Sequence, residues 1–312
     1  MSTLKRRDVL RQALFASAAL SLGHWSGRAP AQARFERDPF SLGVASGYPS
    51  AEGMVLWTRL APDPLAPDGG MPPSAVPVTW EVSRDEQFHG VASRGVAYAE
   101  PDWAHSVHVE VQGLEPAREY WYRFSAGGAR SRVGRTHTAP ASGARVERLR
   151  VAVASCQQYE HGYYAAYRHI VADDPDLIVH VGDYIYELTW GKDLVRHHGS
   201  GECYTLADYR ARYALYRSDP DLAAAHAACP WLLTWDDHEV DNDYAGDSSE
   251  EADDPELFHA RRAAAYRAYY EHMPLPRRAA PAGAAMRLYT SLPFGNLLNL
   301  HLLDERQYRS PL

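Results

Sequence analysis

Cysteine is scarce in this sequence: its 312 residues include only Cys156, Cys203 and Cys229. The odd count excludes a framework in which every thiol is paired, because at least one must lie outside any intramolecular disulfide. Cys156 follows a predicted strand beside other candidate ligands, so we predict that it is the free thiol. Its alternative role is that of an inert buried side chain. The sequence leaves open whether Cys203 and Cys229 form a disulfide.

The N-terminal apolar stretch, residues 13–23, is too short to cross a bilayer, which takes roughly 20 apolar residues. It follows the twin-arginine run Lys5–Arg11 and precedes Ala31-Gln32-Ala33, whose small residues suit a cleavage site. We therefore predict that residues 1–33 are a twin-arginine signal peptide rather than a stable membrane anchor. This predicts recognition by the twin-arginine export machinery and a periplasmic or secreted mature protein.

Positive charge is also in short supply. Lysine and arginine together number 32 against 40 aspartate and glutamate residues, which gives a net charge of -8. Because the chain also has no basic stripe, this balance argues against a nucleic-acid-binding module. Internal repeats and long low-complexity tracts are absent. Roughly 280 residues remain after the signal peptide, which is enough for two domains.

The first predicted domain, residues 38–140, is all β. Short alternating runs separated by turn signals indicate antiparallel strands. Leu114-Glu115-Pro116 precedes an aromatic run at 119–124. This order is typical of fibronectin type III-like sandwiches, in which a tyrosine hydroxyl bonds back to the backbone at a corner. The expected strands include 54–58, 76–82 and 106–111.

The second predicted domain, residues 147–312, alternates strands and helices, which indicates a layered α/β domain. A helix is expected over 257–272, because Pro274 would end it. The other expected helices are 162–170 and 208–216, and the expected buried strands are 149–154, 176–181, 231–233 and 296–303.

Candidate metal ligands follow three of these predicted strands. Cys156 comes after the strand 149–154, Asp183 after 176–181, and residues 234–239 (TWDDHE) after 231–233. Aspartates alone also suit turns. However, carboxylates at this density repel one another unless a cation or a proton relieves them. Strand ends are also where open α/β sheets place their ligands. The three ends together therefore predict a metal site.

Seven motifs, in this order along the chain, resemble the PhoD-like alkaline phosphatase and phosphodiesterase family. This family is a branch of the metallophosphatases that also includes some secreted phospholipases D. The motifs are Leu42–Gly47, Val55–Leu60, Ala154–Gln157, His180–Glu187, Thr234–Asn242, Tyr269–Pro274 and Leu303–Arg309.

The resemblance implies a site with ferric iron (Fe3+) and calcium (Ca2+) that holds the substrate phosphate between the ions. Cys156, Asp183 and Tyr186 would bind the iron, because thiolate and phenolate suit a trivalent transition ion. Asp237 or Asn242 would supply oxygen to calcium. The sequence leaves open which of Asp236, Asp237, Asn242 and Asp243 bind metal. The resemblance gives His238 a catalytic role, as a group that stabilises charge or protonates the leaving oxygen.

Three features depart from the family pattern. Tyr48 replaces an aspartate in Gly47-Tyr48-Pro49, a change expected to concern packing. Asn242-Asp243 replaces a pair of asparagines. The late Gly-Asp-x-His segment, which supplies further ligands in the family, does not occur before Leu312. The catalytic domain is therefore expected to be incomplete and C-terminally truncated, and to bind iron weakly.

These observations predict an exported, metal-dependent phosphate-ester hydrolase of the PhoD alkaline phosphatase type, using a metal-activated hydroxide. The substrate is a phosphomonoester or a phosphodiester, and the sequence does not separate the two. The alternatives are a phosphodiesterase or phospholipase D of the same family, and a non-catalytic cell-surface binding protein. His197 and His198 are expected to be solvated in a loop, and Arg261 and Arg262 to form a solvated helix face.

Overall fold

The computed structural model describes residues 34–251 and 254–310. The predicted twin-arginine signal peptide, residues 1–33, lies outside the described residues. Within those that are described, no helix combines the length and apolar character needed to cross a membrane. The elements are, in order, β1 (Val44–Ser50), β2 (Gly53–Arg59), β3 (Val76–Ser83), β4 (Val91–Ala99), η1 (Pro101–Trp103), β5 (Ser106–Val111), β6 (Glu119–Ala126), β7 (Ala129–Arg130), β8 (Gly134–His137), β9 (Val151–Ala154), η2 (Tyr159–His161), α2 (Ala165–Ala172), β10 (Leu177–Val181), α3 (Leu206–Arg217), α4 (Pro220–Ala228), β11 (Trp231–Thr234), α5 (Pro255–His272), η3 (Arg277–Ala279), β12 (Thr290–Phe294) and β13 (Leu298–Leu302).

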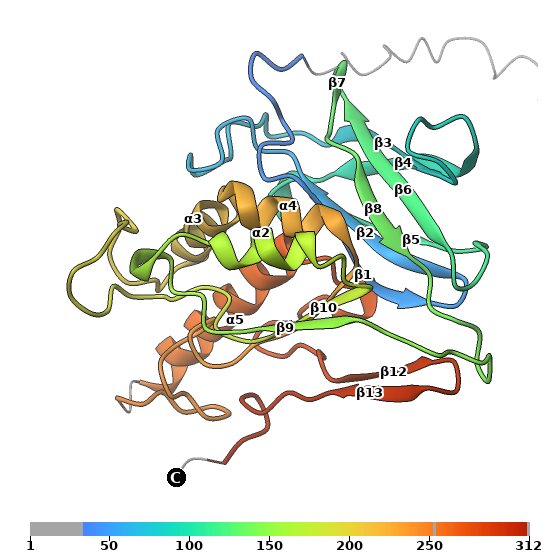
Figure 1. Cartoon of the computed structure of the whole chain (residues 1–312). Coiled ribbons are helices and arrows are strands. Elements are labelled where there is room, and N and C mark those ends of the chain that lie inside the picture. Colours follow the sequence, from blue (N-terminus) through green and yellow to red (C-terminus); the bar gives the residue numbers. More distant parts are fainter. Residues whose placement is uncertain (1–33, 252–253, 311–312) are drawn as a thin grey trace, which may run out of the picture. The chain divides into compact units, whose positions relative to one another are not determined.

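A six-stranded sheet in the order β5-β2-β1-β11-β10-β9 joins the two halves of the described chain. Its first three strands pair antiparallel, whereas β1, β11, β10 and β9 pair parallel. The join depends on Gly47, opposite Trp231, because a Cβ there would lie 2.7 Å from the carbonyl oxygens of Trp231 and Pro274. Figure 1 shows α2 and α4 on one face of β9 and β10, and the β12–β13 hairpin on the other. The division into domains 38–140 and 147–312 stays a prediction.

The second large sheet has the order β4-β3-β6-β7, with β8 also paired to β6. The expected runs 54–58, 76–82 and 106–111 are β2, β3 and β5, which confirms the β-rich N-terminal half. At the predicted corner, the backbone N–H of Glu115 donates to the hydroxyl of Tyr120 at 2.9 Å. Tyr120, Tyr122 and Phe124, which alternate along β6, are fully buried and belong to the core.

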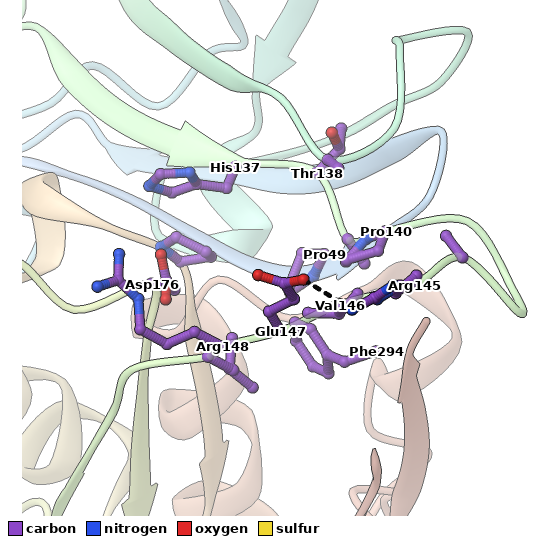
Figure 2. Close-up of a pocket in the computed structure, with 15 residues that line it drawn as sticks. Pro49, His137, Thr138, Pro140, Arg145, Val146, Glu147, Arg148, Asp176 and Phe294 are labelled. Carbon is purple, nitrogen blue, oxygen red and sulfur yellow. Dashed lines mark ion pairs between the residues drawn. The ribbon is translucent and has the colours of Figure 1, made fainter. Parts of the chain in front are cut away.

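A pocket of about 390 Å³ lies beside the segment that connects β8 to β9 (Figure 2). Its walls include Leu149, Asp176 and Pro230, which lie one or two residues before β9, β10 and β11. An ion pair between Arg145 and Glu147, 3.1 Å long, crosses its exposed side. The pocket therefore lies at the N-terminal ends of the parallel strands, opposite the edge at which ligands usually bind.

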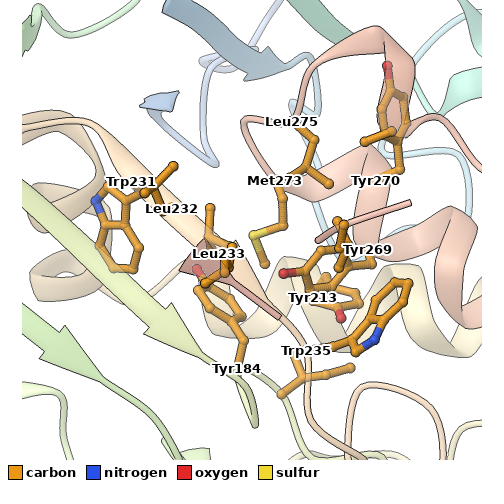
Figure 3. Close-up of a cluster of buried hydrophobic side chains, with 14 of the residues drawn as sticks. Tyr184, Tyr213, Trp231, Leu232, Leu233, Trp235, Tyr269, Tyr270, Met273 and Leu275 are labelled. Carbon is orange, nitrogen blue, oxygen red and sulfur yellow. The ribbon is translucent and has the colours of Figure 1, made fainter. Parts of the chain in front are cut away.

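The main core surrounds β11, where Trp231, Leu232 and Leu233 are fully buried among aromatic and aliphatic side chains (Figure 3). Tyr48, the residue that departs from the family pattern, donates its hydroxyl to the carbonyl of Leu233 at 3.2 Å. Its expected role in packing agrees with this contact. His180 stacks on Trp231 inside the core, and burial lowers its pKa to about 3, so the ring is neutral.

Several expectations require correction. The helix expected from residue 162 begins at Ala165. The last strand, β13, was expected to be buried, but Leu298 is exposed and only Leu302 is buried. The reason is that β13 pairs with β12 alone. Arg261 and Arg262 are buried at 5% and 6% exposure instead of forming a solvated face, because carboxylates pair with them. The sequence left open whether Cys203 and Cys229 pair; all three cysteines, which lie within the described residues, are free thiols, so the prediction for Cys156 is confirmed, and Cys203 and Cys229 are buried.

We predict that Gly182→Ala will lower the free energy of unfolding by about 2 kcal/mol or more. Gly182 has φ +114°, and a Cβ there would clash with the backbone nitrogen of Asp236. Gly199→Ala is the matched control, because Gly199 has φ +73° but no atom within 4 Å of its Cβ position. Urea unfolding of both variants measures the difference. Equal losses would show that the close approach at Gly182 carries no cost.

Candidate active site

The three predicted strand ends meet at one edge of the six-stranded sheet. Because β9, β10 and β11 are parallel neighbours, Cys156, Asp183 and the segment after Thr234 all leave the sheet on the same side. Cys156 and Asp183 both adopt left-handed backbone conformations, with φ of 54° and 53°. The backbone N–H of Cys156 donates to the carbonyl of Gly182 at 3.1 Å, which holds the first two ends together.

Glu239 connects the turn after β10 to the turn after β11. Its buried carboxylate accepts hydrogen bonds from the backbone N–H groups of Asp183, Tyr184 and Asp236, at 3.1, 2.5 and 2.9 Å. Burial raises the pKa of this carboxyl well above its usual value, with the charge of Asp183 adding to the effect, whereas the three amides lower it. Glu239 lies in the motif Thr234–Asn242, but its role was not predictable, because its partners are backbone groups that sequence does not reveal.

Asp183, Asp237 and His238 form a buried group whose ligand atoms all lie within 4.8 Å of one another. The Oδ1 atom of Asp183 is buried and has no hydrogen-bond partner among the described residues. Burial raises the pKa of the Asp183 carboxyl, His238 opposes the rise and Asp237 adds to it. A cation would compensate both the unpaired oxygen and the repulsion between the carboxylates. The carboxylates of Asp183 and Asp237 therefore fit a metal ion, with His238 beside them.

The two other predicted iron ligands lie against Asp183. The Tyr186 hydroxyl donates to Asp183 Oδ2 at 3.0 Å. Burial, followed by the charge of Asp183, raises the pKa of Tyr186 far above its usual value. The pKa of the Cys156 thiol is raised for the same two reasons. Both side chains are therefore protonated at neutral pH without a metal, and a bound cation would be needed to stabilise the thiolate and phenolate.

The predicted calcium ligands differ in where they point. Asp237 faces the metal group, and its Oδ2 accepts the backbone N–H of Asp243 at 2.7 Å. The Asn242 side-chain amide instead donates to Glu250 at 2.6 Å. The guanidinium of Arg306 lies 2.5 Å from an oxygen of Asp236 and 3.2 Å from an oxygen of Asp237. No role was predicted for Arg306 from the sequence. It comes from the last of the seven motifs, and only the fold brings it to this edge.

His238 is held by Glu187, a second residue that sequence reasoning left without a role. Glu187 Oε2 lies 2.8 Å from His238 Nδ1, and Glu187 Oε1 accepts the backbone N–H of Asn242 at 2.9 Å. Burial alone would lower the pKa of His238, but the hydrogen bond and charge of Glu187 raise it to about 9. The ring of Tyr186 covers the imidazole, with ring centroids 4.1 Å apart. Glu187 follows Tyr186 directly in the recognised motif, which was the available signal.

His198 is buried, so the expectation that it is solvated was wrong. Its Nε2 lies 3.0 Å from the Tyr216 hydroxyl, and its backbone N–H donates to Glu160 at 2.9 Å. Glu160 also accepts from the Thr189 hydroxyl at 3.3 Å. The loop between Glu187 and Tyr204 is therefore anchored by a buried carboxylate, although its glycines suggested a solvated segment.

We predict that Glu187→Gln will lower the pKa of His238 from about 9 towards or below its usual 6.5 in the metal-free chain, because burial then acts without the neighbouring charge. Since the folded pKa is raised, the pair stabilises the fold fully below pH 6.5 and loses that contribution as pH rises through about 9. NMR titration of the His238 ring measures the shift. Glu250→Gln is the control, because it also removes a nearby carboxylate, but one that contacts the Asn242 side chain and does not hydrogen-bond His238. An unchanged His238 titration in Glu187→Gln would contradict the prediction.

Comparison with known proteins identifies the family of the chain. The family model for the PhoD-like phosphatase matches residues 151–312, and the model for the N-terminal domain of PhoD-like phosphatases matches residues 27–140. Alkaline phosphatase D of Bacillus subtilis (strain 168) is 55% identical over 280 residues, covering 88% of this chain and 48% of the relative. A solved structure of PhoD superimposes with a TM-score of 0.88 at 54% identity, covering 89% of this chain and 54% of that one. The chain thus spans about half the length of these relatives. It belongs to the PhoD-like phosphatase family.

Proposed function

We propose that this protein is an exported, metal-dependent hydrolase of phosphate esters. The observation that carries the proposal is the buried group of Asp183, Asp237 and His238 at the carboxyl ends of adjacent parallel strands. Membership in the PhoD-like phosphatase family supports the reaction class. Because the chain spans about half of its relatives, the activity of the whole protein is part of the proposal.

The proposed ions are Fe3+ and Ca2+. Cys156, Asp183 and Tyr186 would hold iron, since a thiolate and a phenolate suit a trivalent transition ion. Asp237 would offer oxygen to calcium, and Asn242 could join it if its amide left Glu250. When bound, these ions would polarise the phosphoryl oxygens of the ester.

The side chains of this chain would orient the proton donor and balance the charge of the aspartates. Glu187 orients His238 through Nδ1 and keeps the ring protonated at neutral pH, so that Nε2 carries a proton for the leaving oxygen. Arg306 offsets the charge of Asp236 and Asp237. The Tyr186 ring, tilted by 31° against the imidazole at a centroid distance of 4.1 Å, limits the access of water to the covered face of His238.

The finer features of the sequence interpretation are also proposals. Residues 1–33 would direct twin-arginine export to the periplasm or the medium, and residues 38–140 would form a fibronectin type III-like sandwich. A phosphomonoester and a phosphodiester remain the two substrate classes. Rates on a nitrophenyl monoester and on the matching diester would separate them.

Elemental analysis tests the metal proposal. We expect purified protein, supplied with iron and calcium, to retain both ions, and Asp183→Asn to lose iron, because Asp183 holds the unpaired buried oxygen. Asp68→Asn, in an exposed turn, is the control for a lost aspartate. Protein that carries neither ion under these conditions would favour the non-catalytic binding protein instead.

Turnover tests the role of His238. Replacing His238 with Ala should reduce turnover of a phosphate ester by about 10²–10⁴-fold, the usual loss for a proton donor. His259→Ala, on the exposed side of α5, removes an imidazole without touching the site and should leave turnover unchanged. A His238→Ala enzyme as fast as the wild type would remove His238 from the mechanism.

A further inference from the structure

A second pocket, of about 340 Å³, opens beside His238 and has no role in the mechanism above. Leu188 and Trp190, from the loop that follows Glu187, and Tyr204, from just before α3, form its apolar wall. Asn242 and several carboxylates form its polar side. Because His238 is the proposed donor to the leaving oxygen, a pocket that borders its ring lies where the alcohol part of an ester would sit.

Trp190 is the exposed aromatic face of this pocket. Its side chain is 59% exposed, and its ring centroid lies 6.3 Å from that of His238. The loop holds it in place, because His161 Nε2 hydrogen-bonds the Trp190 carbonyl at 2.7 Å. A Cβ at the neighbouring Gly191 would lie 2.8 Å from the same nitrogen, so the backbone packs tightly there. The backbone that carries the exposed indole is therefore fixed next to the proposed acid, where the ring can contact a ligand.

The polar side of the pocket is acidic. It is lined by four carboxylates and one arginine, Arg261. Arg261 already pairs with Glu202 and Asp241, at 2.8 and 2.9 Å, and it also covers the Tyr204 ring. Glu250 and Glu251 have no ion pair with a lysine or arginine among the described residues, and no described arginine or lysine lies over the Trp190 ring. The pocket therefore offers a free aromatic face and uncompensated negative charge.

We propose that this pocket is the leaving-group subsite and that Trp190 makes it selective for a positively charged alcohol, either a quaternary ammonium or an amino alcohol. A cation above an indole is attracted by the ring quadrupole, and nearby carboxylates add to the attraction. An anionic alcohol would be repelled by the same carboxylates. The proposal rests on the proposed function, because it names the ester that the site would cleave.

The reaction balances without a further reagent. The oxygen of water bonds to phosphorus as the bond from phosphorus to the alcohol oxygen breaks. The proton that the attacking water loses balances the proton that the departing alcohol oxygen gains. The products are the phosphate and the free cationic alcohol, which Trp190 would bind directly. Binding of that alcohol is therefore a readout that needs neither metal nor turnover.

The test compares two alcohols of the same shape and different charge, choline and 3,3-dimethylbutan-1-ol, on the metal-free 312-residue chain. Saturation-transfer NMR on their methyl protons gives each dissociation constant. We expect choline to bind at least about fivefold more tightly than the neutral alcohol. Raising the salt concentration should weaken choline alone, because only its binding is electrostatic.

Two variants locate the contact. Trp190→Ala should weaken choline binding about 5- to 30-fold, the usual range for losing a cation–π contact, and Trp190→Phe should recover part of the loss. Tyr98→Ala is the matched control, because Tyr98 is 60% exposed on β4 and does not line the pocket. The Glu250→Gln/Glu251→Gln double variant should weaken choline and leave the neutral alcohol unchanged.

Equal binding of the two alcohols, no choline binding at millimolar concentrations, or unchanged choline binding in Trp190→Ala would each overturn the proposal. Tighter binding of the neutral alcohol would indicate an apolar leaving group instead and would also overturn it. If the proposed function itself is wrong, the result is different: the purified protein binds no metal and cleaves no phosphate ester. Choline selectivity is measured without either property, so the two failures are distinguishable.

Discussion

The site depends on the buried carboxylate of Glu239. It accepts three backbone amides, two from the turn after β10 and one from the turn after β11. An unpaired backbone N–H costs free energy when buried, so these bonds satisfy donors that neither strand can pair within the sheet. They also hold Asp183 and Asp236 next to each other. Without this bridge, the backbone N–H groups of the two turns would lose their shared acceptor, although the carboxylates that the turns carry repel each other.

Burial then determines the chemistry of each side chain. The same loss of solvent raises the pKa of Asp183, Tyr186 and Cys156, and on its own it would lower that of His238. Glu187 reverses the effect at His238, because a hydrogen-bonded carboxylate outweighs the cost of burying the imidazolium. One edge of the sheet therefore carries the protonated side chains of Tyr186 and Cys156 beside a charged imidazolium, and a bound cation would change the balance of all of them.

Local patterns predicted the strands well and the burial of polar residues poorly. Apolar runs located β9, β10 and β11, and Pro274 correctly limited α5 to His272. The errors concern residues whose environment comes from distant parts of the chain. Arg261 was assigned to a solvated face, but Glu202 and Asp241 pair with it from other segments. The β13 strand has an apolar sequence, yet it lies on an isolated two-stranded sheet that buries little of it.

The sequence by itself determined which residue types could bind metal and that they follow strands, because strand periodicity and ligand chemistry are local properties. It also carried the motifs by which the chain resembles the PhoD-like family. Only the tertiary structure decided that β9, β10 and β11 are parallel neighbours, that Glu187 contacts His238, and that Arg306 reaches Asp236 and Asp237. The contact between Glu187 and His238 joins residues 51 positions apart, and the contact between Arg306 and Asp236 joins residues 70 positions apart. Pairing at such separations is set by how the whole core packs, so no local pattern can specify it.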